Sequence, residues 1–271
     1  MAESRAITGR PIRVVMFGSG PSLTHEARRF LARLEKHPEI ELVSAFCQAD
    51  IRSRFAVVKD LWRRRGILAL PLLVAWYGNI LTRYLRQPGA EMELRRTLNG
   101  LEDRIHLVQD VHAAEVLEQV ARLAPDLGLV YGSPILKPAL FEIPARGTLG
   151  IHHGKVPQYR GNKTTFWAVY NGEPAAGVTI QKINPGLDTG EIVKEGEVPV
   201  GKRSLRRISS DLETLGLDLY IQAILEVKAG TATFRPQSGP KGTLYRNPKP
   251  ADFLRFAAKR LARRVSRAGG D

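Results

Sequence analysis

Two adjacent histidines and a later aspartate have the types and spacing needed for acid/base chemistry. His152 and His153 close a short apolar run, and a loop containing glycine and proline follows them, which should expose His152 at the end of a strand. Asp188 comes from a later loop, GLDTG. A lone histidine is more often structural than catalytic, but a carboxylate on a neighbouring loop can orient the ring or hold a water. We therefore predict a reaction centre at His152 and Asp188, with His153 as a further candidate.

Short apolar segments alternate with helical patterns along the part of the chain that must position these residues. Strands that alternate with helices imply βαβ units and a parallel sheet. The sequence thus predicts an α/β fold, Rossmann-like, with a central, mostly parallel sheet and a short α+β C-terminal extension. The strands are expected at 12–18, 40–46, 105–108, 126–131, 148–152, 190–200 and 230–236, and the helices at 24–36, 112–123, 138–142, 204–228 and 251–267.

We expect a catalytic domain over residues 1–203, with a basic and apolar helical insertion at 51–100, and a C-terminal extension over 204–271. GSGPS after the first expected strand matches only part of the GxGxxG pattern, and no acidic residue ends the second strand. A dinucleotide cofactor is therefore not expected.

The positive charge of the chain is concentrated in two regions. The formal net charge is +14, and residues 51–100 and 241–271 account for all of it: 10 basic against 3 acidic residues in the first, and 9 against 2 in the second. Regional basic patches favour an anionic partner, such as a nucleic acid, an acidic membrane surface or a phosphorylated substrate. A solvated surface is the alternative.

Both basic regions contain apolar residues as well. The segment 66–81 is flanked by arginines, but it is short for a membrane-spanning helix and Pro71 interrupts it. It can pack on the domain as a helix, lie in a membrane interface within 62–86, or form an interface with a protein partner. The tail 251–267 is a cationic amphipathic helix, which can meet an anionic surface or dock with its basic face in water. The oligomeric state is left open.

Cys47 is the only cysteine, so no intramolecular disulfide forms, and no Cys/His cluster indicates a metal site. The N-terminal residues lack the apolar core of a secretory signal. A cytoplasmic location, with or without peripheral membrane association, is the expectation.

The segment from Tyr131 to Ile192 carries a family resemblance. It contains YGSPIL, then H-x(4)-P-x-Y-R-G, W-A-x-x-N-G-E, G-V-T-I and G-L-D-T-G, in that order. This run resembles the folate-dependent formyltransferases, which include methionyl-tRNA, glycinamide ribonucleotide and sugar N-formyltransferases. The resemblance implies that 10-formyltetrahydrofolate is the co-substrate and that its formyl group passes to an amine. It also implies that His152 stabilises a tetrahedral intermediate and that Asp188 organises a water or proton path. The implied folate-binding residues are Pro134, Ile135, Leu136, Asn184, Pro185, Gly186, Leu187 and Asp188.

One position departs from the family pattern, because Gly150 stands where the motif Asn-x-His has its asparagine. Loss of one such oxyanion donor typically costs about 3 kcal/mol. His153, Asn162 or Lys163 could supply a substitute donor. Lys155 is either a cation for an anionic substrate or an ordinary surface lysine. The loop residues considered for substrate contact are Gly150, Lys155, Tyr159, Arg160, Asn162 and Lys163.

Three hypotheses follow for the function. In the first, the chain is a formyltransferase that acts on an amino sugar or another small amine, including an anionic or phosphorylated one. Alternatively, the same fold carries out hydrolysis or another one-carbon or acyl transfer, or it is a catalytically silent binding protein. Transfer RNA is disfavoured as the substrate, because the C-terminal region is short and its basic tail has few aromatic residues besides Phe253 and Phe256.

Overall fold

The computed structural model describes residues 5–19, 25–48, 62, 63, 66, 74 and 100–268. Most of the expected insertion at 51–100 lies outside these residues, and so do most of the segments 62–86 and 66–81. The predictions made for them are therefore not addressed by the structure.

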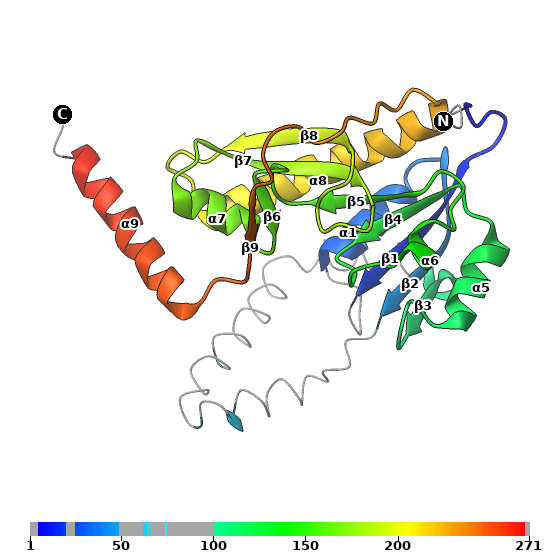
Figure 1. The fold of residues 1–271 in the computed structure, drawn as a ribbon, viewed down its shortest axis with the longest axis horizontal. Coiled ribbons are helices and arrows are strands. Elements are labelled where there is room, and N and C mark those ends of the chain that lie inside the picture. The colour runs from blue at the N-terminus through cyan, green and yellow to red at the C-terminus, as the bar shows by residue number, and fades with distance from the viewer. Residues whose placement is uncertain are drawn as a thin grey trace. The chain divides into compact units, whose positions relative to one another are not determined.

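A mostly parallel sheet of seven strands, in the order β3-β2-β1-β4-β5-β7-β8, forms the centre of the fold (Figure 1). This confirms the predicted α/β class. The strands are β1 (Ile12–Ser19), β2 (Ile40–Gln48), β3 (Ile105–Val108), β4 (Leu127–Tyr131), β5 (Thr148–His152), β7 (Ala175–Lys182) and β8 (Ile192–Pro199). The helices are α1 (His25–Leu34), the short 3-10 helix η2 (Glu102–Arg104), α5 (Ala114–Leu123), α6 (Pro138–Phe141), α7 (Thr164–Asn171), α8 (Leu205–Ala229) and α9 (Pro250–Ala268).

The chain divides into two compact units, and residues 13–143 form one of them. In this unit β1 pairs in parallel with β4, and β2 pairs in parallel with β3. Val14 to Phe17 are completely buried, as expected for a strand that is covered on both faces. The register places Gly18 beside Tyr131, so β1 and β4 end together at the carboxyl edge of the sheet. Ligands of α/β folds bind at this edge.

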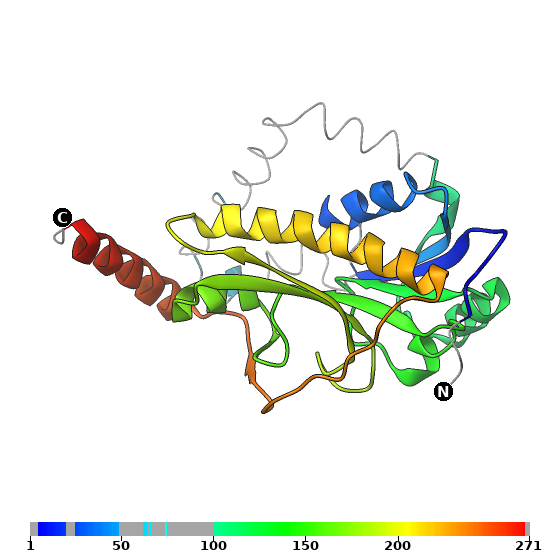
Figure 2. The same ribbon diagram turned by 90° about the horizontal axis from the view of Figure 1, so that it is seen from above.

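The second unit comprises residues 1–12 and 144–271, and its three strands of the central sheet, β5, β7 and β8, are antiparallel. β7 lies between β5 and β8, and α8 packs along β7 and β8, as Figure 2 shows (α8 in yellow to orange). Ser204 caps the start of α8 by accepting a hydrogen bond from the Arg207 amide, and Gly230 ends it with a φ of 71°. The buried Tyr220 hydroxyl donates to the Leu149 carbonyl at 2.6 Å, which ties the helix to β5.

The C-terminal segment returns to the loop that follows His152. Its strand β9 (Thr243–Tyr245) pairs in parallel with β6 (Tyr159–Gly161). Beyond β9, the rings of Phe253 and Phe256 on α9 each lie 5.1 Å from the ring of Phe166 on α7. The first turns of the amphipathic helix therefore pack on α7 through aromatic residues.

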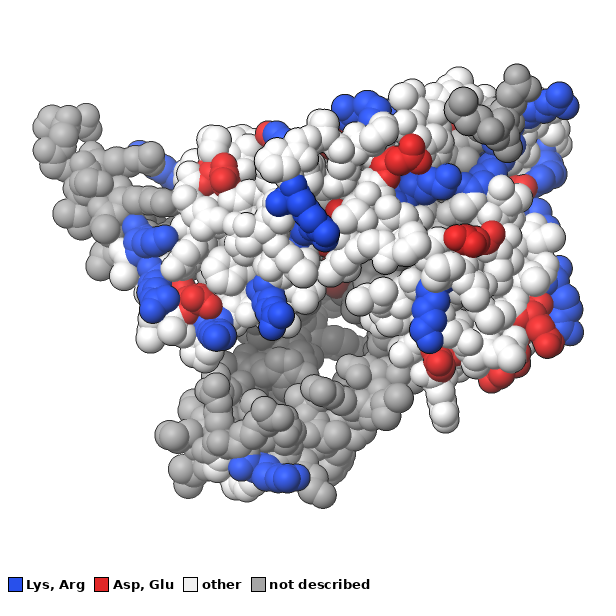
Figure 3. Space-filling view, in the orientation of Figure 1, with Lys and Arg blue, Asp and Glu red and all other residues white. Residues whose placement is uncertain are grey.

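Basic side chains of this segment face solvent, and lysines and arginines are visible there at the left of Figure 3. The exposed basic residues of the described part are Lys241, Arg246, Lys249, Arg255 and Lys259. This arrangement matches a docked helix with its basic face in water. Contact with an anionic surface stays a prediction.

The prediction of a strand at 230–236 is wrong. Only an isolated bridge between Ile192 and Arg235 forms in this range, because the chain continues toward β6 rather than along β8. The helix α7 and the strand β7 were not anticipated as elements. Within the described residues, no helix is long and apolar enough to cross a membrane.

Candidate active site

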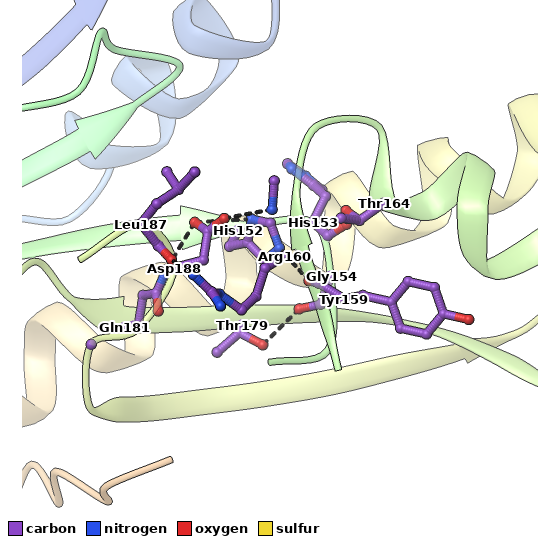
Figure 4. A network of polar contacts seen from close by, with 12 residues as sticks. His152, His153, Gly154, Tyr159, Arg160, Thr164, Thr179, Gln181, Leu187 and Asp188 are labelled. Carbon is purple, nitrogen blue, oxygen red and sulfur yellow. Dashed lines mark hydrogen bonds and ion pairs between the residues drawn. The ribbon is translucent and has the colours of Figure 1, made fainter. Parts of the chain in front are cut away.

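The structure brings His152 and Asp188 together, as Figure 4 shows. His152 is the last residue of β5, and its Nδ1 lies 3.4 Å from Oδ1 of Asp188. The two side chains are 9% and 14% exposed, so their interaction is only weakly screened by water. Nε2 of the same imidazole lies 2.8 Å from the Tyr159 carbonyl oxygen. Both ring nitrogens thus face acceptors.

Asp188 joins the GLDTG turn to the Y-R-G segment. Its Oδ2 accepts a hydrogen bond from the Gly161 amide at 2.7 Å. The buried Arg160 guanidinium donates twice to the Leu187 carbonyl, at 3.1 Å from Nε and 2.7 Å from Nη2. Each motif therefore holds the other in place, which explains why both are needed to position the carboxylate.

The turn itself is built to present Asp188. Its φ of 51° lies in the left-handed region, which aspartate enters more readily than most residues. Asn184 stabilises the turn, because its Oδ1 accepts from the Gly186 amide at 3.1 Å and from the Thr189 hydroxyl at 2.9 Å. Asn184 thus supports the turn, whereas the neighbouring Pro185 and Leu187 are exposed.

The loop after β5 packs directly on the imidazole. A Cβ at Gly154 would lie 2.5 Å from both His152 Nε2 and the Tyr159 carbonyl oxygen, so only glycine fits at this position. Thr179, which faces His152 across the β5–β7 pair, donates to the Gly154 carbonyl at 2.8 Å. Glycine at 154 therefore allows the loop to close over the ring.

Burial lowers the pKa of His152, and the nearby Asp188 carboxylate acts in the opposite direction. A neutral imidazole donates through one nitrogen only, whereas the imidazolium donates through both. The ring is therefore held neutral by desolvation, while the acceptors around it are arranged to receive a second N–H. Such a group can take up and return a proton.

The lowered pKa predicts a pH dependence of stability. Below an ordinary histidine pKa of about 6.5, the unfolded chain binds a proton at His152 that the native protein does not bind. The stabilisation is therefore complete above that pH and is lost as the pH falls. We expect the free energy of unfolding of His152→Gln to decrease less than that of the wild type between about pH 7 and pH 5. Urea titrations at several pH values test this, and identical slopes for both proteins would contradict it.

The three residues predicted as substitutes for the missing asparagine donor at position 150 lie in different surroundings. His153 Nε2 lies 2.9 Å from Glu213 Oε2 on α8, so its ring is directed to that helix. Asn162 and Lys163 are exposed, and Lys163 forms the N-cap of α7. Gly150 itself is buried in β5, where it pairs with Gln181 of β7.

Gln181 and Gln237 are site residues that the sequence analysis missed. Gln181 is 4% exposed, and its Nε2 lies 3.4 Å from Asp188 Oδ1. Gln237 Nε2 lies 3.3 Å from Gln181 Oε1 and also contacts the backbone carbonyls of Asp188 and Gly190. A polar residue inside the apolar strand 175–182 was a usable signal for Gln181. No local signal marks Gln237, because it reaches the site only through the return of the C-terminal segment.

A cavity of about 260 Å³ lies beside this centre. Its polar groups are largely satisfied within the protein. Lys155 forms an ion pair with Glu197, which raises the lysine pKa, and Glu173 accepts from the Tyr159 hydroxyl at 2.7 Å. Lys155 is exposed and paired with Glu197, which fits a surface lysine, and its contact with a substrate stays a prediction.

The remaining predicted residues lie in the other unit. Leu136 is buried and Ile135 is 74% exposed, and both follow β4, as Pro134 does. Their assignment to a folate pocket stays a prediction. The described residues contain no group of three or more His, Cys, Asp or Glu side chains that could hold a metal ion.

Comparison with known proteins shows a similarity to one family over part of the chain. The profile described as formyl transferase matches residues 99–224. A methionyl-tRNA formyltransferase from Synechococcus sp. (strain JA-2-3B'a(2-13)) is 32% identical over 142 residues, which are 51% of this chain and 44% of that protein. The matched region thus spans less than half the length of this relative.

Two solved structures show the same fold at low identity. A sugar N-formyltransferase from Shewanella sp FDAARGOS_354 aligns with a TM-score of 0.56 and 13% identity, over 90% of this chain and 86% of that one. The sugar 3N-formyl transferase WlaRD, solved in the presence of dTdp and 5-N-formyl-THF, aligns with a TM-score of 0.50, over 88% and 70% of the two chains, at 14% identity. His152 and Asp188 both lie within the residues that the formyl transferase profile matches, so the similarity to this family includes the reaction centre.

Proposed function

We propose that the protein is an enzyme that transfers a formyl group from 10-formyltetrahydrofolate to an amine of a small substrate, such as an amino sugar. The observation that carries this proposal is the buried contact between His152 and Asp188 inside the formyl transferase domain. The folate-related ligand named for a structural neighbour supports the choice of donor.

The donor supplies an electrophilic formyl carbon, and the acceptor amine attacks it. The bond between that carbon and N10 of the folate then breaks, and the proton lost by the amine must reach N10. Asp188 and His152 have the properties needed to hold this proton, because a carboxylate and a neutral imidazole lie 3.4 Å apart in a site with little solvent. Both ring nitrogens of His152 meet acceptors of the protein, so a ring N–H would reach the formyl oxygen only in exchange for one of these two contacts.

Methionyl-tRNA is the second candidate acceptor. Curated relatives that match include methionyl-tRNA formyltransferases, and the C-terminal segment presents exposed basic side chains. A small amine remains our proposal because both described aromatic residues of α9 contact Phe166 of α7, and Phe253, at 52%, is the only one of the two that is largely exposed, which leaves α9 little surface for stacking of bases. The two candidates make different predictions for salt-dependent tRNA binding.

Calorimetric titration with 5-formyltetrahydrofolate is the first test, followed by formyl transfer assays with amino sugar nucleotides, glycinamide ribonucleotide and methionyl-tRNA as acceptors. We expect folate binding and transfer to at least one small amine. Failure to bind the folate would contradict the proposal. Binding with transfer only to tRNA would establish the second candidate, and binding without transfer to any acceptor would favour a different reaction or a binding role on the same fold.

The division into a catalytic domain, residues 1–203, and an extension, residues 204–271, stays a prediction from the sequence. In the structure, Gln237 from the extension contacts Asp188. We therefore propose that the extension contributes to the reaction centre.

A further inference from the structure

Gln181 on β7 lies opposite Gly150 on β5. The two residues are directly paired between β5 and β7, and His152 pairs with Thr179 two positions along. Paired residues of antiparallel strands point to the same face, and so do residues two apart on one strand. The side chain of Gln181 therefore shares the face on which His152 meets Asp188.

The orientation of the Gln181 amide is determined by its neighbours. Gln237 Nε2 lies 2.8 Å from the Gly190 carbonyl oxygen and 3.1 Å from the Asp188 carbonyl oxygen. Backbone carbonyls only accept hydrogen bonds, so Gln237 must present its nitrogen at this place. The nitrogen then meets the oxygen of Gln181, at 3.3 Å, and directs the Gln181 nitrogen toward Asp188.

The result is an amide donor aimed at the reaction centre. Gln181 Nε2 lies 3.4 Å from Asp188 Oδ1, the same oxygen that faces His152 Nδ1. An amide nitrogen carries two N–H groups, and the contact with Asp188 uses one of them. The side chain is almost completely buried, so a hydrogen bond from it is not weakened by competition with water.

We propose that Gln181 is the amide donor that stabilises negative charge on the formyl oxygen during transfer, and that Gln237 is the residue that positions it. This inference rests on the proposed function. Gln181 takes on the task for which Gly150 has no side chain, and it does so from the neighbouring strand. The donor is oriented before the reaction, which is the condition for a large electrostatic effect.

The test compares two folate analogues by calorimetry. One carries an aldehyde that hydrates to a gem-diol and so mimics the tetrahedral intermediate, and the other is a reduced folate without this group. Gln181→Met keeps the length of the side chain but lacks the amide. It should weaken binding of the gem-diol analogue by roughly 100-fold and of the plain folate by less than about threefold. Gln237→Met should weaken the gem-diol analogue selectively, but by a smaller factor.

Matched variants separate a donor from a structural role. Gln222→Met makes the same change at an exposed position of α8 and should leave both affinities unchanged. Gln181→Leu also removes the amide, with a smaller apolar side chain and no new charge beside Asp188, so it should show the same selective loss even if the methionine variant folds poorly.

Equal weakening of both analogues, or no weakening of either, in the Gln181 variants would overturn the inference. If the wild type bound neither analogue, the proposed function itself would be wrong. The inference about Gln181 would then be wrong as well.

Discussion

Replacing Asp188 by asparagine is expected to reduce formyl transfer by about 10²–10⁴-fold. Asparagine has the same shape, and its oxygen can still accept from the Gly161 amide, so the turn should keep its conformation. It is neutral, however, and cannot take up the proton that the attacking amine must lose. The loss should appear in kcat, because the change acts on proton transfer rather than on binding.

The control for this variant is Asp103→Asn, which makes the same change at an exposed position of η2. It should retain the activity of the wild type. Affinity of Asp188→Asn for 5-formyltetrahydrofolate, measured by calorimetry, should stay within about threefold of the wild type. Transfer by Asp188→Asn at a rate within a few fold of the wild type would show that Asp188 does not move the proton.

Replacing Gly190 by alanine should destabilise the protein by about 3 kcal/mol or more. A Cβ at this position would overlap the backbone carbonyl of Lys182. The overlap cannot be relieved by a side-chain rotation, because the Lys182 amide also donates to the Glu191 carbonyl at 2.9 Å and holds the two segments together. Urea unfolding followed by circular dichroism measures the effect.

Gly186→Ala is the matched variant within the same turn. A Cβ there would first meet the Thr189 side chain, which can rotate, although the rotation would cost its hydrogen bond to Asn184. We expect a loss of about 1 kcal/mol. If both variants were equally stable, the close backbone approach at Gly190 would not be the reason for glycine in the motif.

The sequence alone determined the fold class and the pair at the centre of the site. Apolar runs such as 12–18 and 126–131 became strands, because the hydrophobic pattern of a buried strand is local and needs no tertiary information. The order of H-x(4)-P-x-Y-R-G and G-L-D-T-G indicated His152 and Asp188, and the structure places them in contact.

The tertiary structure decided which groups surround that pair. Whether His153, Asn162 or Lys163 reaches His152 depends on the path of a loop, and spacing along the chain does not determine it. The strand expected at 230–236 failed for the same reason, because pairing with β8 competes with the return of the chain to β6.

Gln181 and Gln237 show most clearly what local sequence patterns do not predict. They are 56 residues apart in sequence, and each is an ordinary polar residue by itself. They meet because β5 and β7 are antiparallel and because the C-terminal segment passes beside the turn that carries Asp188. Local patterns predict on which face of its own strand a residue lies. Which donors complete a reaction centre depends on contacts between segments that are distant in the sequence.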